Sequence, residues 1–374
     1  MQSYTGLNKQ FINGQWIDAM ENPVIENINP YTGTSIHSIA TAGKKEVDAA
    51  FDAAKNAFQK WSTRNPLYRR DLLLKAAELI LLRKEEFTEW LAKETGSTYI
   101  KAIVEVQQAH DILVEASSFP TRMSGLTLNS TIDDKETYVY RKPLGVIGLI
   151  SPWNWPLYLS MRTIAPALGT GNTIVVKPSS SSPVTGGTII GKLLEEAGIP
   201  PGVFNVVVGN SDIIGDYFTG HPHAKMISFT GSTPVGKNIG RITGEKLKKS
   251  ALELGGNNVF IVLEDADIDA ATDAAVFGKF LHQGQLCISI NRILLHKKVF
   301  EEFKEKFLGK IKQLPVGDPS DKNTIIGPVI DNKSLKRIQD IIQRSVEMGA
   351  IVEAGNKTDN NILYPTVLSH VTAD

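Results

Sequence analysis

From residue 144 onward, short apolar runs alternate with amphipathic segments, and this alternation restricts the possible folds more than any other feature. A short apolar run bounded by turn signals is typical of a buried strand, whereas the amphipathic segments carry the helical period. We expect strands at Val146–Ile150, Thr173–Val176, Val203–Val208 and Met226–Phe229, and helices near 157–168, 184–197, 211–219 and 233–242. This pattern predicts a parallel β-sheet covered by helices, the α/β class.

The alternation resumes after Glu253, which indicates a second α/β unit beginning near residue 255. Its expected elements are a strand at Val259–Leu263, a helix from about 267, a strand at Arg292–Leu295 and a helix at 298–313. Before the first strand, residues 45–62 and 67–120 carry helix-period apolar positions, separated by Asn65-Pro66. Between these helices and the first strand, 128–141 has a polar stretch and then strict alternation, which predicts a β-hairpin.

The composition excludes several protein classes. Forty basic and forty acidic residues give zero formal charge, so no basic excess favours nucleic acid as a partner. We see no cationic start followed by an apolar run, and no stretch approaches the roughly 18 apolar residues of a membrane-spanning helix. Cys287 is the only cysteine, which fits a reducing cytoplasm. At 374 residues, two domains are expected.

Parallel α/β sheets bind ligands at the carboxyl ends of their strands, so the turns that leave strands are the informative segments. The first, Ser151-Pro-Trp-Asn-Trp-Pro156, holds Asn154 in a stiff turn, although taken alone it is better explained as a Trp-packed structural turn. The second, Lys177-Pro-Ser-Ser-Ser-Ser-Pro183, can hold ribose hydroxyls or phosphate oxygens. Taken alone, it is better explained as a helix start with a solvated lysine.

The third turn is Gly231-Ser-Thr-Pro-Val-Gly-Lys-Asn238, which follows a strand and opens a helix. Its amides and hydroxyls can therefore meet a diphosphate. It lacks the G-x-G-x-x-G dinucleotide fingerprint but matches the G-x-x-x-x-G-K of a P-loop. Asn238 stands where a P-loop needs Ser or Thr to hold magnesium, which argues against a nucleoside triphosphatase.

Glu253 and Cys287 form the fourth feature. Glu253 ends an apolar segment, and the Gly255-Gly256 pair that follows allows a sharp turn. A carboxylate there can act as a general base for water, and Cys287 can act as a nucleophile where its thiolate is favoured. For Cys287 alone, a buried unreactive thiol is the alternative. All four features occur in chain order at strand or segment ends, which favours a common site.

Together these segments resemble the aldehyde dehydrogenase superfamily over essentially the whole chain. The shared motifs are Ser-Pro-Trp-Asn, Val-Val-Lys-Pro-Ser, Phe-Thr-Gly-Ser-Thr-x-Val-Gly, Leu-Glu-Leu-Gly-Gly and Gly-Gln-x-Cys, in that order. The resemblance implies an α/β fold of two Rossmann-like parallel-sheet domains, the second incomplete, with a β-hairpin for oligomerisation. It implies a cofactor-binding domain with N-terminal helices (1–127 and 142–254), the hairpin (128–141) and a truncated catalytic domain (255–374).

The resemblance also assigns roles to residues. It implies Cys287 as the nucleophile, Glu253 as the general base and Asn154 as an oxyanion-hole amide, with no metal. The implied site for NAD or NADP consists of Ile150, Ser151, Pro152, Trp153, Lys177, Ser179, Ser180, Gly209, Phe229, Gly231, Ser232, Val235, Leu254 and Gly255. Within it, Lys177 would touch the adenosine ribose, Ser232 a phosphate, and Leu254-Gly255 the nicotinamide end.

The implied reaction oxidises an aldehyde to a carboxylic acid. The Cys287 thiolate adds to the aldehyde to give a thiohemiacetal, hydride passes to the nicotinamide, and water activated by Glu253 hydrolyses the resulting thioester. Relatives that pass the acyl group to coenzyme A or make acyl phosphates usually lack this Glu, so its presence predicts hydrolytic chemistry.

In the implied cofactor site and in the implied substrate pocket, some residues differ from those that are common in the family. Many members have Glu at the position of Ser180, where it binds the ribose 2′-hydroxyl and repels a 2′-phosphate, so Ser180 leaves NADP open. Leu286, Ile288, Trp155 and Tyr158 would form an apolar, aromatic-rich substrate pocket. The resemblance therefore favours aromatic aldehydes such as benzaldehyde.

The length departs from the family as well. Members usually continue past the point where this sequence ends, through a Glu-x-Phe-Gly-Pro segment whose Glu binds the nicotinamide ribose, so the chain is expected to be C-terminally short. One hypothesis is a cytoplasmic homodimeric or homotetrameric enzyme acting on a small aldehyde, without membrane or nucleic-acid partners. The alternative is a non-catalytic truncated fragment that only binds nucleotide or associates with homologues.

The histidines offer a further alternative, a plain thiol hydrolase. That activity needs a His base near Cys287, and His282 lies five residues before it. No orienting partner is evident in the sequence, so we expect His282 at the surface. We expect His221-Pro-His223 in a loop, where the neighbouring residues offer few further ligands for a metal ion.

Overall fold

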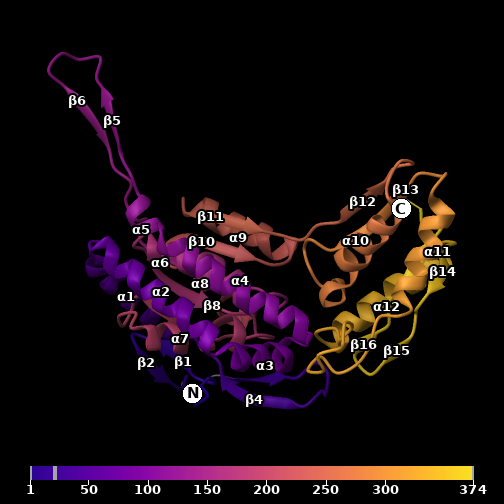
Figure 1. Cartoon of the computed structure of the whole chain (residues 1–374). Helices are drawn as coiled ribbons and strands as arrows, with labels where there is room; N and C mark the ends of the chain where they lie inside the picture. Colours follow the sequence, from indigo (N-terminus) through magenta and orange to yellow (C-terminus); the bar gives the residue numbers. More distant parts are fainter. Residues whose placement is uncertain (1, 20–22, 373–374) are drawn as a thin grey trace. The chain divides into compact units, whose positions relative to one another are not determined.

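The computed structural model of the chain describes residues 2–19 and 23–372; Met1 and Asp374, which bound the expected domains, lie outside the described residues. The chain divides into two compact units, and Figure 1 labels their elements. Unit 1 comprises residues 1–27, 37–86 and 105–253, and unit 2 comprises 28–36, 87–104 and 254–374.

Unit 1 is built on a seven-stranded sheet with the strand order β11-β10-β7-β8-β9-β1-β2. The strands are β1 Gln10–Ile12, β2 Gln15–Ile17, β7 Val146–Ile150, β8 Thr173–Lys177, β9 Phe204–Val206, β10 Ala224–Thr230 and β11 Lys249–Glu253. The five strands from β11 to β9 pair in parallel, and β1 joins β9 and β2 in antiparallel fashion. β8 is buried along its whole length because helices cover the sheet.

Each parallel strand from β7 to β10 is followed by a helix, as the alternation predicts. These helices are α6 Pro156–Gly169, the π-helical turn η1 Val184–Thr188 that leads into α7 Ile189–Ala197, α8 Ser211–Gly220 and α9 Thr233–Glu245. The α/β class is thereby confirmed, although β9 is shorter than the predicted strand Val203–Val208. β1, β2 and β11 were not predicted, because β1 and β2 are only three residues long and β11 is a largely exposed edge strand, so none shows the apolar alternation that identifies a strand.

The N-terminal part is helical after two short strands, β3 Val24–Ile28 and β4 Ser35–Ala40. The helices are α1 Lys44–Trp61, α2 Pro66–Leu82, α3 Lys84–Thr95, α4 Tyr99–Ser117 and α5 Phe119–Arg122. The break between α1 and α2 is built by Asn65, whose side chain accepts a hydrogen bond from Leu67 N at 2.9 Å. Pro66 then occupies the first helical position, where its missing N–H is harmless.

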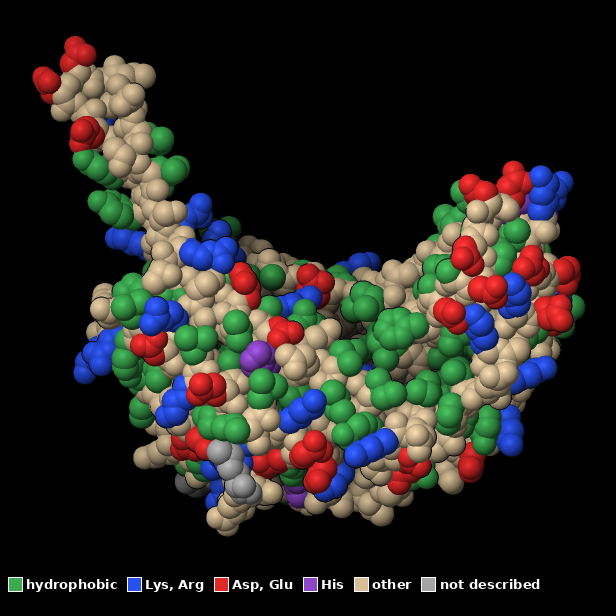
Figure 2. Space-filling model, in the orientation of Figure 1, with side chains coloured by type: hydrophobic (Ala, Val, Ile, Leu, Met, Phe, Trp, Pro, Cys, Tyr) green, Lys and Arg blue, Asp and Glu red, His purple; other side chains and the backbone are tan. Residues whose placement is uncertain are grey.

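The predicted hairpin is present as β5 Leu126–Asn129 and β6 Glu136–Val139, paired antiparallel with Leu126 opposite Val139. We call it the arm, because it stands away from α5, from which the chain enters it (Figure 1). Figure 2 shows apolar side chains along the arm and acidic ones at its tip. The exposed apolar residues are Leu126, Leu128, Ile132, Tyr138, Val139 and Tyr140.

Unit 2 contains the second parallel sheet, of two strands, β12 Asn258–Val262 and β13 Ile290–Leu295. The helices α10 Ile268–Phe280 and α11 Phe300–Ile311 pack on each other, and their core includes Val262, Ala275, Phe303 and Phe307. The remaining elements are the short helix η2 Leu281–Gly284, α12 Asn332–Glu347, β14 Ile351–Ala354, β15 Thr358–Asp359, β16 Ile362–Leu363 and β17 Val367–Ser369. The second α/β unit expected from the sequence is therefore observed.

The expected domain division differs from these units at two segments, because residues 28–36 and 87–104 pack with unit 2. Gly96 shows the reason: a Cβ on it would lie 2.6 Å from Pro328 Cγ and 3.1 Å from Pro30 Cγ. Only a residue without a side chain allows this close packing of three loops. None of the described helices is long and apolar enough to span a lipid bilayer.

Candidate active site

The carboxyl ends of the parallel strands in unit 1 gather the predicted residues at one edge of the sheet. Ile150 pairs with Lys177 on one side and with Phe229 on the other, and Thr230 pairs with Glu253. The chain runs from β7 outward through β8 and β9, and then returns to place β10 on the opposite side of β7. This reversal is a topological switch point, where doubly wound sheets bind nucleotides in the crevice beyond the strand ends.

The turn after β7, which carries Asn154, is anchored by α4. Trp155 is 8% exposed, and its indole N–H donates to Gln108 Oε1 at 3.0 Å. Glu105 Oε1 accepts from Leu157 N at 2.8 Å, in the first turn of α6. These contacts fix the chain on the C-terminal side of Asn154. Sequence reasoning missed Glu105 and Gln108, because neither carries a local signal that it faces a turn about 50 residues away.

Lys177 at the end of β8 is 1% exposed, so the alternative of a solvated lysine is wrong. Its Nζ donates to Ser211 Oγ at 2.8 Å, at the start of α8. Burial lowers the pKa of Lys177 to about 8, and the nearby Asp212 partly opposes this shift. Because the buried ammonium group of Lys177 is poorly hydrated, a polar ligand that binds beside it would stabilise its charge.

Beyond Lys177, the serine-rich turn folds on itself. Ser179 Oγ accepts from Ser181 N at 3.2 Å, whereas Ser180 is exposed. On the neighbouring connection after β9, Gly209 packs tightly, since a Cβ there would lie 2.5 Å from Ile214 Cδ1.

The turn after β10 begins α9, with Ser232 as its exposed N-cap and Val235 49% exposed. A Cβ on Gly231 would lie 2.5 Å from the Phe229 ring, so only glycine fits this close to the strand end. The free N–H groups of the first helical turn are suited to an anion. Asn238 donates to Asp216 Oδ1 at 2.7 Å, a contact with α8 that fits no P-loop magnesium site.

Glu253 ends β11, and its side chain is 64% exposed. Its backbone carbonyl accepts from Gly231 N at 3.0 Å, which ties it to the turn after β10. Arg162 Nη2 lies 4.0 Å from Glu253 Oε2, an exposed pair that stabilises the fold little. Glu253 is thus a solvated carboxylate at the edge of the sheet where the residues predicted to bind a cofactor gather.

Cys287 lies in unit 2 on a tight turn closed by the hydrogen bond from Ser289 N to Leu286 O at 3.1 Å. Its side chain is exposed, so the alternative of a buried unreactive thiol is wrong. The preceding residues His282, Gln283 and Gly284 have φ angles of 51°, 55° and 72°. Residues other than glycine rarely adopt this left-handed backbone conformation, because it is strained. Such strained backbone persists where surrounding contacts hold it in place, often at functional sites.

His282 is fully buried, so the expectation of a surface histidine is wrong. Burial and the nearby Lys101 hold its pKa well below the usual range, which keeps the imidazole neutral. His221, expected in a loop, caps the end of α8 and is 4% exposed, with Nε2 3.1 Å from Asp48 Oδ1. Within residues 2–19 and 23–372, no group of three or more His, Cys, Asp or Glu side chains is arranged to hold a metal ion.

The predicted site residues are divided between the two units. Unit 1 carries Ile150, Ser151, Pro152, Trp153, Asn154, Trp155, Tyr158, Lys177, Ser179, Ser180, Gly209, Phe229, Gly231, Ser232, Val235 and Glu253. Unit 2 carries Leu254, Gly255, Leu286, Cys287 and Ile288. Ser151 is 3% exposed, and its N–H donates to Lys177 O at 3.2 Å, so it braces the strand ends.

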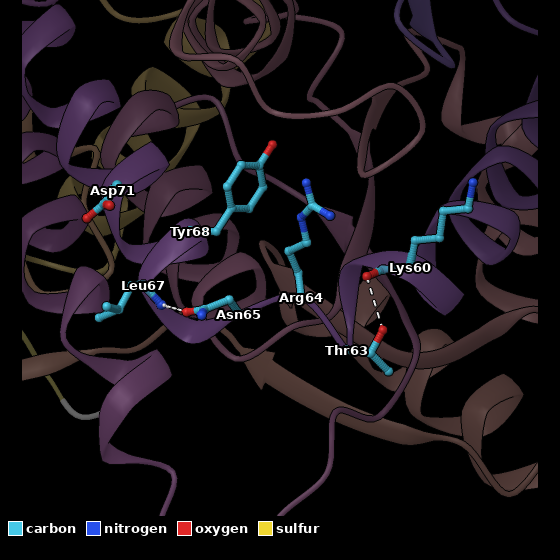
Figure 3. A pocket seen from close by; sticks show the side chains of 7 residues that line it. All are labelled: Lys60, Thr63, Arg64, Asn65, Leu67, Tyr68 and Asp71. Carbon is cyan, nitrogen blue, oxygen red and sulfur yellow. Dashed lines mark hydrogen bonds between the residues drawn. The ribbon is translucent and has the colours of Figure 1, made fainter.

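A surface hollow of about 690 Å³ lies elsewhere, around the break between α1 and α2 (Figure 3). Its lining is mixed in charge, and Arg64 stacks 4.5 Å from the centre of the Tyr68 ring. The lining residues are Lys60, Thr63, Arg64, Asn65, Leu67, Tyr68 and Asp71. None of the predicted site residues belongs to this hollow.

Comparisons with known proteins identify the family to which this chain is similar. Residues 16–374 match the sequence profile of the aldehyde dehydrogenase family. A vanillin dehydrogenase of Corynebacterium glutamicum is 46% identical over 368 residues, which cover 98% of this chain and 76% of the relative. The benzaldehyde dehydrogenase YfmT of Bacillus subtilis is 45% identical, with 99% and 76% covered. The crystal structure of an NAD-dependent benzaldehyde dehydrogenase from Corynebacterium glutamicum superposes with a TM-score of 0.95 at 45% identity, covering 99% of this chain and 81% of that one.

Proposed function

Because the chain belongs to the aldehyde dehydrogenase family, we propose that Cys287, Glu253 and Asn154 carry out its reaction. The reaction is the oxidation of an aldehyde to a carboxylic acid, with hydride passing to NAD or NADP. The observation that carries the proposed roles is the exposure of the single thiol on a strained turn, in a chain whose strand ends gather Lys177, Asn154 and Glu253 at a switch point. A reactive cysteine needs this access, and a structural one does not.

Each proposed residue has a distinct chemical task. The Cys287 thiolate attacks the aldehyde carbon and forms a C–S bond, which turns the carbonyl oxygen into an alkoxide. The Asn154 amide and the backbone N–H of Cys287 donate to this oxygen, and each such donor typically contributes about 3–4 kcal/mol in the transition state. A nicotinamide bound at the end assigned to Leu254-Gly255 would supply the hydride acceptor, and loss of hydride from the carbon leaves Cys287 carrying a thioester. Glu253 then removes a proton from the attacking water, and the acid and the thiolate are released.

The cofactor residues fit a dinucleotide at the carboxyl edge of the unit 1 sheet. The start of α9, at Ser232 and Val235, offers N–H groups to a phosphate, and the missing Cβ of Gly231 allows close approach. The ammonium group of Lys177 is assigned to a hydrogen bond with a ribose hydroxyl, and Ser179 and Ser180 follow it in the chain. Ile150 to Trp153, Gly209 and Phe229 form the floor, and Leu254-Gly255 are assigned to the nicotinamide end.

We propose an aromatic aldehyde as the substrate. The relatives named for vanillin and benzaldehyde support this choice. Ile288 is 75% exposed beside Cys287, and Leu286 and Tyr158 are half-buried, so apolar side chains remain available for an aromatic ring. Trp155 is enclosed and bound to Gln108, so it supports the turn of Asn154 more than it offers a surface to substrate.

The test is turnover of benzaldehyde or vanillin with NAD or NADP, followed by the absorbance of the reduced nicotinamide. Cys287→Ala is expected to abolish the signal while the protein still binds nucleotide. Equal turnover by the parent and Cys287→Ala would reject the proposed nucleophile. A parent that binds nucleotide without turning over any aldehyde would instead support the binding-only alternative.

We further propose that two or four copies associate through the arm and that the protein works in the cytoplasm. The arm exposes six apolar side chains, four of them on its two strands, an unusual surface for a segment that stays in water. The single exposed thiol is compatible with a reducing compartment.

A further inference from the structure

Asn258, the first residue of β12, binds two backbone carbonyl groups of the turn that carries Cys287. Its Nδ2 donates to Cys287 O at 2.7 Å and to Ser289 O at 3.0 Å. An amide nitrogen carries two N–H groups, so the two bonds use its full donor capacity. The side chain is half-buried, and its bond to Ser289 O is partly shielded from water, whereas its bond to Cys287 O is exposed.

The position of Asn258 in the sheet explains why a side chain is needed here. β12 and β13 pair with Asn258 opposite Ile290 and Val259 opposite Arg292, so the ladder passes over Asn291. The turn of Cys287 lies just before β13 and therefore outside this backbone ladder. The Asn258 side-chain amide donates hydrogen bonds to two carbonyl groups of this turn, which the backbone hydrogen bonds between β12 and β13 do not reach.

The residues before the turn are held by other contacts. Gln285 Oε1 accepts from Ile330 N at 2.9 Å, and its Nε2 donates to His282 O at 3.2 Å. The left-handed segment 282–284 is thereby fixed to the loop before α12. Residues 286–289 are held by the closing bond of their own turn, by the bond from Ser289 Oγ to Lys279 O at 3.3 Å, and by the two bonds from Asn258, one of them the only bond to Cys287 O among the described residues.

We propose that Asn258 is a positioning residue that fixes the Cys287 turn, so that the Cys287 Sγ and backbone N–H keep the orientation required by the reaction. This inference rests on the proposed role of Cys287 as the nucleophile. Asn258 belongs to unit 2, whereas Lys177 and Ser232, which are assigned to the cofactor, belong to unit 1. Its loss should therefore slow the chemical step and leave cofactor binding intact.

Asn258→Asp tests the proposal, because Asp keeps the shape of the side chain but cannot donate to the two carbonyl groups. We expect kcat for benzaldehyde to fall about 10- to 100-fold, with KM and the Kd for NAD within about twofold of the parent. We also expect amide hydrogen exchange in residues 286–289 to accelerate about tenfold, a readout that needs no turnover. Asn258→Ser, which retains one donor, should recover part of both effects.

Asn257→Asp is the matched control, because it makes the same change at an adjacent exposed residue. It should behave like the parent in both assays. Hydrogen exchange in 286–289 that is the same in Asn258→Asp and the parent overturns the proposal, as does an unchanged kcat. A failure of the proposed function is recognised separately, because Cys287→Ala then retains turnover whatever the Asn258 variants do.

Discussion

The carboxylate of Glu105 accepts hydrogen bonds from the backbone N–H groups of Leu157 at 2.8 Å and of Tyr158 at 3.3 Å. Glu105 lies on α4 and is fully buried, and the two N–H groups belong to the first turn of α6. These N–H groups have no partner within their own helix, and a negative charge at a helix N-terminus is favourable. A distant helix therefore fixes the start of α6, immediately after Asn154.

Replacing Glu105 with Ala should lower the free energy of unfolding by about 1–3 kcal/mol, since buried donors lose their acceptor. Turnover should fall as well, because the turn of Asn154 loses its anchor. Urea denaturation followed by circular dichroism measures the first effect and the nicotinamide assay the second. Glu115→Ala changes an exposed carboxylate on the same helix and should stay within about 0.5 kcal/mol of the parent. Equal losses in both variants would contradict the role of Glu105.

The buried Lys177 makes stability depend on pH. Its pKa of about 8 is lower than the value near 10.4 of an unfolded chain. Between these two values the unfolded chain binds a proton that the folded chain has lost, so stability rises with pH through this window. The destabilising contribution is fully present below pH 8.

Lys177→Met should therefore be more stable than the parent at pH 7, by about 2 kcal/mol, and this advantage should shrink toward pH 10. The same variant should bind NAD at least about tenfold more weakly, because it loses the proposed ribose contact. Urea unfolding at pH 7 and pH 10 and a nucleotide titration measure the two effects. The quantity to compare is the free energy of unfolding of Lys177→Met minus that of the parent. If this difference is smaller at pH 7 than at pH 10, burial does not destabilise the charged ammonium group.

The parallel strands and the turns that follow them could be predicted from the sequence, because their signals are local. Val146–Ile150 is an apolar run that ends at a proline-rich turn, and Thr173–Lys177 is another. Edge strands were missed for a physical reason: Lys249–Glu253 is half exposed, so nothing in its sequence separates it from a loop. It is nevertheless the strand that places Glu253 at the edge of the site.

Contacts between distant segments could not be predicted in the same way. His282 was expected at the surface, yet it is buried in a left-handed turn beside Lys101, which the chain contributes from α4. Asn258 lies two residues after a glycine pair that suggests only a sharp turn, and its two bonds to the Cys287 turn depend on the pairing of β12 with β13. Such roles depend on tertiary packing, for which the spacing of residue types carries no signal.

The arm can be tested through two of its leucines. Leu126→Asp with Leu128→Asp places charges on two exposed strand residues that are 59% and 46% exposed. If copies associate through the arm, the variant should elute as a smaller species in size-exclusion chromatography with light scattering, with unchanged circular dichroism. Leu82→Asp, at a leucine 66% exposed on α2, should leave the mass unchanged. A parent that is already monomeric would contradict the proposed association.

Ser180 should set the tolerance for a 2′-phosphate. It is exposed beyond the end of β8, three residues after Lys177. Ser180→Glu introduces a carboxylate that repels a phosphate but can accept from a 2′-hydroxyl, so kcat/KM with NADP should fall about 10- to 100-fold relative to NAD. Ser180→Gln, which lacks the charge, should change the ratio less. If the parent itself turns over NADP no better than Ser180→Glu does, Ser180 does not govern the choice of cofactor.

Glu253→Gln should separate the two halves of the reaction. The amide keeps the shape of the side chain at the end of β11 but cannot remove a proton from water, so hydrolysis of the thioester should slow by about 100- to 10,000-fold. Hydride transfer precedes this step, and a rapid burst of about one reduced nicotinamide per Cys287 should remain in stopped-flow absorbance. Cys287→Ala should show no burst, which distinguishes a blocked second step from a misfolded site. A Gln variant without a burst would mean that Glu253 acts before the hydride leaves, and its role as the base for water would have to be given up.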